Sequence, residues 1–118
     1  MNILLLIYAA NNILLGLGGL FVPARTVPVE NPPAIALSLM QSMGAFAIAT
    51  GVLAWLARGI EDINALRAIT LVFILATAIN AVVLIISIRN GARNSSEWIF
   101  VGVDVVFAAA FFYFRSKL

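Results

Sequence analysis

The run AITLVFILATAINAVVLIISI at residues 68–88 decides the fold class. It carries no charged side chain, and its length matches the roughly 20 residues that a helix needs to cross a hydrocarbon core of about 30 Å. Three further apolar runs of similar length occupy residues 3–22, 34–57 and 98–114. The strands of a membrane barrel would instead alternate in hydrophobicity over about ten residues. The four runs therefore predict transmembrane helices.

The composition of the chain agrees with this prediction. Of its 118 residues, 64% are hydrophobic and only 10% are charged, which is more apolar surface than a soluble domain of this size can bury. A basic residue at the centre of a membrane helix costs about 2.5–3.5 kcal/mol, and all seven basic residues lie at the ends of the runs or between them. We expect residues 1–118 to form a single all-α domain, an integral membrane four-helix bundle with up-down-up-down order and short loops.

The ends of the runs carry helix-capping and interface signals. Asn31 precedes two prolines and is the predicted N-cap of the second helix, because proline is tolerated in the first helical turn. Asp62 is the predicted N-cap of the third helix, and Ser95 or Ser96 that of the fourth. Aromatic rings that suit the membrane–water boundary lie near run ends, at Trp55, Trp98 and Tyr113.

Loop charges predict the orientation of the helices. If the N-terminus is cytoplasmic, four basic residues lie inside and three outside. The inner set is Arg58, Arg67, Arg115 and Lys117, and the outer set is Arg25, Arg89 and Arg93. We expect both termini to be cytoplasmic, and a bias this small also permits dual topology.

The residue types that are missing exclude several kinds of chemistry. The chain has no His and no Cys, so haem, iron–sulfur and zinc sites with those ligands are not expected. No catalytic residue set and no metal site is predicted, and we expect a protein that is not an enzyme. Lipid, quinone or pigment could still lie in grooves between helices. The basic residues are scattered, so nucleic acid is not an expected partner.

Each predicted helix carries a strong hydrogen-bonding side chain. These are Asn12, Gln41, Asn80 and Asp104, in the order of the helices. At about 1.5 Å per residue they lie at depths close enough for one connected polar seam, which either holds the helices together or lines a path for a ligand or ion. Asp104 is the only charged residue inside a run, and an acid in hydrocarbon commonly marks a functional site. We expect it to hydrogen-bond to Asn80 or to Gln41.

Helical periodicity separates the predicted packing faces from the outer faces. In the third helix one stripe holds Thr70, Phe73, Thr77, Asn80, Leu84 and Ser87. The opposite face, left for lipid or neighbouring helices, holds Val72, Leu75, Ile79, Val83 and Ile86. Glycines expected to allow close packing of the first two helices are Gly16, Gly19, Gly44 and Gly51.

Several of these features together resemble the small four-helix membrane proteins described as DoxX-like. The first helix is rich in glycine and ends in Phe21-Val22-Pro23, and the second closes with Trp55-Leu56-Ala57-Arg58. A polar residue follows in the third helix at Asn80, and an acid in the fourth at Asp104. The resemblance implies a four-helix bundle without a settled activity. In those proteins the position of Asn80 is often basic and would form an ion pair with the acid; Asn80 departs from that pattern.

Two classes of function stay open. The first is a non-catalytic accessory or assembly subunit, whose partners are the lipid bilayer, other membrane-protein subunits or further copies of itself. This hypothesis is based on the short loops, the apolar exterior of the predicted helices and the lack of His and Cys side chains that could bind a metal or haem. The second is an oligomeric transporter or channel for a small solute or ion, with Asp104 as the coupling carboxylate and the three amide side chains as lining groups.

Overall fold

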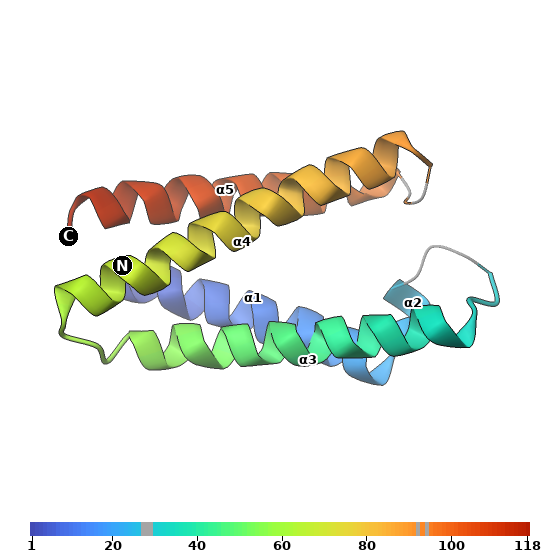
Figure 1. Ribbon diagram of the computed structural model, residues 1–118, viewed down its shortest axis with the longest axis horizontal. Helices are drawn as coiled ribbons and strands as arrows, with labels where there is room; N and C mark the ends of the chain where they lie inside the picture. Colours follow the sequence, from blue (N-terminus) through green and yellow to red (C-terminus); the bar gives the residue numbers. More distant parts are fainter. Residues whose placement is uncertain (27–29, 92, 94) are drawn as a thin grey trace. The chain divides into compact units, whose positions relative to one another are not determined.

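The computed structural model describes residues 1–26, 30–91, 93 and 95–118, which form helices joined by short links and contain no strand. Its elements, in chain order, are α1 (Asn2–Phe21), α2 (Pro23–Thr26), α3 (Ala34–Ala57), α4 (Ile63–Arg89), the 3₁₀ turn η1 (Ser95–Glu97) and α5 (Trp98–Ser116) (Figure 1). Four helical segments are long and apolar enough to cross a membrane: α1, α3, α4, and η1 together with α5. These four segments correspond to the four predicted runs.

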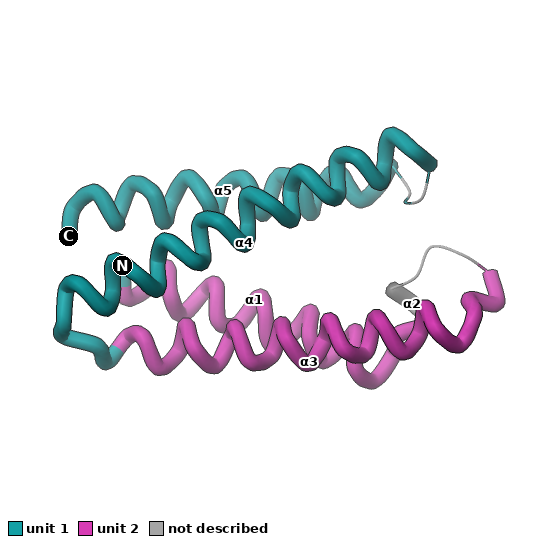
Figure 2. The backbone as a smooth tube through the Cα atoms, viewed as in Figure 1, with its two compact units in different colours: residues 1, 59–118 teal, residues 2–58 magenta. Residues whose placement is uncertain are grey.

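The chain divides into two compact units (Figure 2). Residues 2–58 form one unit, whose long helices are α1 and α3. Residues 59–118, grouped with Met1, form the other, whose long helices are α4 and α5. Each unit is a pair of helices packed along their length.

The start of α4 confirms one capping prediction. Asp62 has an extended backbone and is the N-cap of α4, where its side-chain oxygen accepts a hydrogen bond from the backbone N–H of Asn64 at 2.9 Å. This bond satisfies one of the N–H groups that the first helical turn leaves without a partner.

The other two capping predictions were wrong. Helix α3 begins at Ala34 with Pro33 at the N-cap position, and Asn31 lies outside it with a φ of 49°. The physical reason is that Pro32 itself precedes a proline, which disfavours helical backbone at Pro32 and delays the start of the helix. The two serines, Ser95 and Ser96, lie within η1, because helical backbone begins one turn before α5.

The α1–α3 unit is an antiparallel pair in which the two backbones approach closely. The guanidinium Nε of Arg58, just after α3, donates a hydrogen bond at 2.6 Å to Oδ1 of Asn2, the first residue of α1. A Cβ atom added to Gly16 would lie 2.6 Å from the carbonyl oxygen of Gly44, and one added to Gly44 would lie 2.6 Å from that of Gly16. Only glycine fits at these two positions without displacing the neighbouring helix.

The α4–α5 unit is also antiparallel, but its contact surface is built from large side chains. The rings of Phe73 and Phe111 lie 5.4 Å apart and are tilted, and those of Phe107 and Phe111 are stacked at 6.4 Å. Further along the pair, Leu84 packs with Ala81 and Val101. Phe73 and Phe111 are almost completely buried.

The predicted faces of α4 are largely confirmed. The stripe residues Thr70, Phe73, Thr77 and Leu84 are buried, and each of the five residues assigned to the outer face is more than half exposed. The hydroxyl groups of Thr70 and Thr77 donate to backbone carbonyls of their own helix. Asn80 departs from the stripe, because its side chain is exposed.

Candidate functional site

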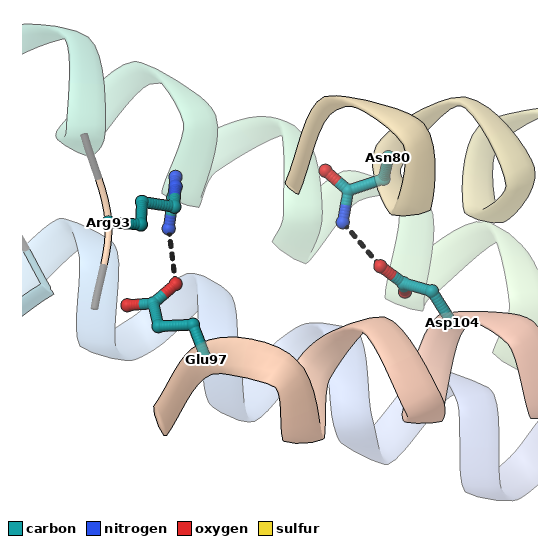
Figure 3. Close-up of polar contacts among 4 residues, drawn as sticks. All are labelled: Asn80, Arg93, Glu97 and Asp104. Carbon is teal, nitrogen blue, oxygen red and sulfur yellow. Dashed lines mark hydrogen bonds and ion pairs between the residues drawn. The ribbon is translucent and has the colours of Figure 1, made fainter. Parts of the chain in front are cut away.

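A side-chain hydrogen bond between two long helices joins Asn80 of α4 to Asp104 of α5 (Figure 3). The amide Nδ2 of Asn80 donates to Oδ2 of Asp104 at 2.6 Å, a short bond of the kind made to a carboxyl oxygen. Asn80 is exposed and Asp104 is half-buried. Of the two partners predicted for Asp104, the structure therefore pairs it with Asn80.

Gln41 and Asn12 make backbone contacts in the other unit. The Nε2 of Gln41 on α3 donates to the carbonyl oxygen of Leu20, in the last turn of α1, at 3.3 Å. Carbonyls in the last turn of a helix have no helical partner, so the Gln41 amide supplies one. The Nδ2 of Asn12 donates to the carbonyl oxygen of Tyr8, one turn earlier in its own helix, at 2.9 Å.

The four polar side chains thus fall into two groups. Asn12 and Gln41 belong to the α1–α3 unit, and Asn80 and Asp104 to the α4–α5 unit. A single seam that contains all four stays a prediction. Within the described residues every buried side-chain nitrogen or oxygen has a hydrogen-bond partner.

The chemistry available at the Asn80–Asp104 pair is that of hydrogen bonding. An amide offers two N–H donors and a carbonyl acceptor, and a carboxyl offers two oxygens. The described residues contain no group of three His, Cys, Asp or Glu side chains that could hold a metal ion. The pair is therefore suited to bind another polar group rather than to hold a metal through several carboxylates.

The four glycines proposed for packing all lie where α1 meets α3. An added Cβ at Gly19 would lie 3.0 Å from the carbonyl oxygen of Met40, and one at Gly51 would lie 2.8 Å from that of Ala9. With Gly16 and Gly44, these positions extend along most of the helix pair. They position α3, and with it the Gln41 amide, against the end of α1.

Arginine side chains make hydrogen bonds at the end of each helix pair that lies opposite the link between its two helices. The sequence did not predict these bonds, because the arginines were interpreted only as charges that flank the helices. The Nη2 of Arg67 donates to the main-chain oxygen of Leu118 at 2.6 Å, and the Nε of Arg115 donates to the carbonyl oxygen of Arg67 at 3.1 Å. Together with the Arg58–Asn2 bond, these contacts join the first two turns of one helix to the end of its neighbour. The sequence feature that could have predicted these contacts is the presence of basic residues close to the ends of the paired helices.

The predicted interface aromatics are exposed, and two of them lie beside a cation. The guanidinium of Arg58 lies 4.8 Å from the ring centre of Trp55, and the ammonium of Lys117 lies 5.3 Å from that of Tyr113. Trp98, at the opposite end of α5 from Tyr113, is 44% exposed. Near it, Arg93 and Glu97 form an ion pair at 2.8 Å (Figure 3).

No family model, curated protein or solved structure matches this chain. Over the residues that it describes, the structure defines a class: an all-helical chain with four segments that are long and apolar enough to span a membrane. The resemblance to DoxX-like proteins stays a prediction.

Proposed function

We propose that this chain is a non-catalytic multi-pass membrane protein that acts by packing, as an accessory or assembly subunit against the transmembrane helices of a larger complex. In this proposal the two helix pairs join into one up-down-up-down bundle with short loops and with both termini in the cytoplasm. Lipid covers the surface that partner subunits leave free, and a quinone or pigment is the kind of cofactor that its grooves could hold.

The observation that carries this proposal is the apolar exterior of every long helix. Each has at least one large apolar side chain that is more than 60% exposed: Leu14 on α1, Phe46 on α3, Ile79 on α4 and Val106 on α5. In water such surfaces would drive association. In a membrane they are compatible with lipid and also with neighbouring helices, which pack by van der Waals contact.

The bonding of the polar side chains adds support. Asn12, Gln41, Thr70 and Thr77 each donate to a backbone carbonyl of their own helix or of the adjacent one. Hydrogen bonds between membrane helices contribute about 0.6 kcal/mol on average, and of these four bonds the one made by Gln41 joins two helices. These side chains are already paired with backbone carbonyls, which favours a structural role over one in lining a solute path.

Co-purification from native membranes tests the proposal. A tagged full-length chain, solubilised in mild detergent, is expected to bring down other membrane proteins in constant proportion. Substituting Ala for one exposed residue on each helix, at Leu14, Phe46, Ile79 and Val106, is expected to lower that recovery for at least one variant while helical content stays unchanged. Glu61→Ala, in the link between α3 and α4, is the matched control.

The proposal fails if the chain purifies alone as a single species at every detergent strength. It also fails if all four surface variants recover the same proteins in the same amounts as the unmodified chain.

A transporter or channel is the second candidate, favoured by one observation. Asp104 places a half-buried carboxyl within an otherwise apolar helix, bonded to an amide. Such a group can serve as a coupling site for a cation or proton. A liposome flux assay tests whether the carboxylate takes part in transport. If the unmodified chain and Asp104→Asn take up solute equally across several pH values, the carboxylate has no role in transport.

A further inference from the structure

The Asn80–Asp104 pair has hydrogen-bonding groups left over. The Asn80 amide uses one of its two N–H groups on Oδ2 of Asp104. Its second N–H, its carbonyl oxygen and the Oδ1 atom of Asp104 remain. Within the described residues of the α4–α5 unit, neither side chain makes a second side-chain hydrogen bond.

The position of the pair makes these leftover groups significant. Asn80 lies about 13 Å before the end of α4, and Asp104 about 9 Å after the start of α5. Both therefore lie within the apolar parts of their helices. The hydrocarbon of a bilayer has no water to satisfy polar groups, so protein must supply the missing partners.

We propose that a second copy of this chain covers the pair, so that two Asn80–Asp104 pairs face each other across a two-fold axis in the membrane. This inference rests on the membrane location in the proposed function. The leftover groups of the pair are self-complementary: the free N–H of one copy can donate to the Oδ1 atom of the other, and the reverse contact follows by symmetry. A contact that repeats in this way is what a two-fold interface requires.

A basic side chain from a different protein fits the pair less well. Lys and Arg carry only hydrogen-bond donors, so a cation can donate to Asp104 but cannot accept from the second N–H of Asn80. That N–H would remain unpaired in the membrane. The second copy pairs this N–H with Oδ1 of Asp104 and leaves the Asn80 carbonyl oxygen, and carbonyl oxygens are left without a partner in proteins more often than N–H groups. For this reason we favour a second copy.

Small residues beside the pair allow a second copy to approach. Ala76 lies one turn before Asn80 on α4 and is exposed, and Ala108 lies one turn after Asp104 on α5 and is half-buried. Because α4 and α5 are antiparallel, both alanines lie on the same side of the pair along the helix axes. Small side chains at a helix contact let backbones approach closely enough for polar groups to meet.

Cysteine cross-linking in liposomes that contain only the purified full-length chain tests this proposal. The chain has no cysteine, so a single introduced thiol reports one position. Val83→Cys places the thiol about 60° around α4 from Asn80, and Val82→Cys places it about 160° away at nearly the same depth. The two valines are similarly exposed, 51% and 55%, so Val82→Cys is a matched control.

A cross-linked species of twice the 12.6 kDa chain mass is expected to form at least fivefold faster for Val83→Cys than for Val82→Cys, and to persist as the protein is diluted in lipid. Adding Asn80→Leu or Asp104→Leu to the Val83→Cys chain is expected to lower its cross-linking at least fivefold. Asp104→Asn is expected to retain it, because an amide still donates and accepts. Circular dichroism of each variant checks that the helices are intact.

Three outcomes overturn the proposal. Equal cross-linking of the two single-cysteine chains would indicate random collision. No cross-linking of Val83→Cys would mean that lipid or another part of the same chain covers the pair. Loss of cross-linking in Asp104→Asn would indicate a charge contact rather than shared hydrogen bonds. Because no other protein is present, each of these results is independent of the co-purification test.

Discussion

At the residue scale, Gly16 and Gly44 set the distance between α1 and α3. Each presents its backbone to the carbonyl oxygen of the other, and an added methyl group at either position would lie 2.6 Å from that oxygen. A contact this short displaces backbone, because the neighbouring atom is a carbonyl and not the end of a flexible side chain. Gly18 is in the same helix, and a Cβ there would meet nothing within 4 Å.

The pair Gly16→Ala and Gly18→Ala therefore makes a controlled prediction. We expect Gly16→Ala to destabilise the fold by about 1–3 kcal/mol, the usual cost of overpacking a tight contact. Gly18→Ala is expected to be neutral or slightly stabilising, because alanine favours helix. Unfolding by SDS titration, followed by circular dichroism, measures both. Equal midpoints for the two variants would contradict the close approach of α1 and α3.

The hydrogen-bond partner of Asp104 could not be predicted uniquely from the sequence. Depth and periodicity left both Asn80 and Gln41 as partners, because each lies at a similar depth in its own helix. The choice depends on which helices pack together, and local periodicity does not contain that information. In the structure α5 packs on α4, which brings Asn80 to the acid, and Gln41 instead supports the end of α1.

At the scale of the elements, the start of α4 depends on Asp62. Its side-chain oxygen accepts a hydrogen bond from the Asn64 N–H, which would otherwise have no partner within the helix. We expect Asp62→Ala to weaken this first turn by about 0.5–2 kcal/mol, the range for loss of an N-cap. Hydrogen exchange at the Asn64 amide is then expected to become several-fold faster.

Glu61→Ala is the control for this prediction, because Glu61 is also an exposed acid and immediately precedes the cap. It is expected to leave exchange at Asn64 unchanged. Faster exchange in both variants would indicate a general effect of removing negative charge near the helix start, and would contradict a specific cap.

Helix boundaries were predictable where composition changes sharply and not elsewhere. The run at residues 34–57 coincides with α3, because proline precedes it and Arg58 follows it. Helix α4 begins at Ile63, five residues before the predicted run, because its first turns contain the polar residues Asn64 and Arg67. Hydropathy locates the apolar part of a helix, whereas hydrogen bonding and capping determine the residues at which the helix begins and ends.

At the scale of the whole molecule, the proposed function requires that all four long helices cross the membrane. Each unit is an antiparallel pair of apolar helices, and the short link between Arg58 and Asp62 joins the end of α3 to the start of α4. If all four long helices cross, the α3–α4 link and the end of α5 lie on one side of the membrane. The α4–α5 link then lies on the other side.

Labelling of single cysteines in native membranes with a membrane-impermeant maleimide tests this arrangement most directly. The suitable positions are Glu61, Asn90 and Lys117, which are exposed in the structure, and the chain has no native cysteine to interfere. We predict that Glu61→Cys and Lys117→Cys are labelled only from the cytoplasmic side and Asn90→Cys only from the opposite side. Labelling of all three positions from one side, or of positions 61 and 117 from opposite sides, would contradict four crossings.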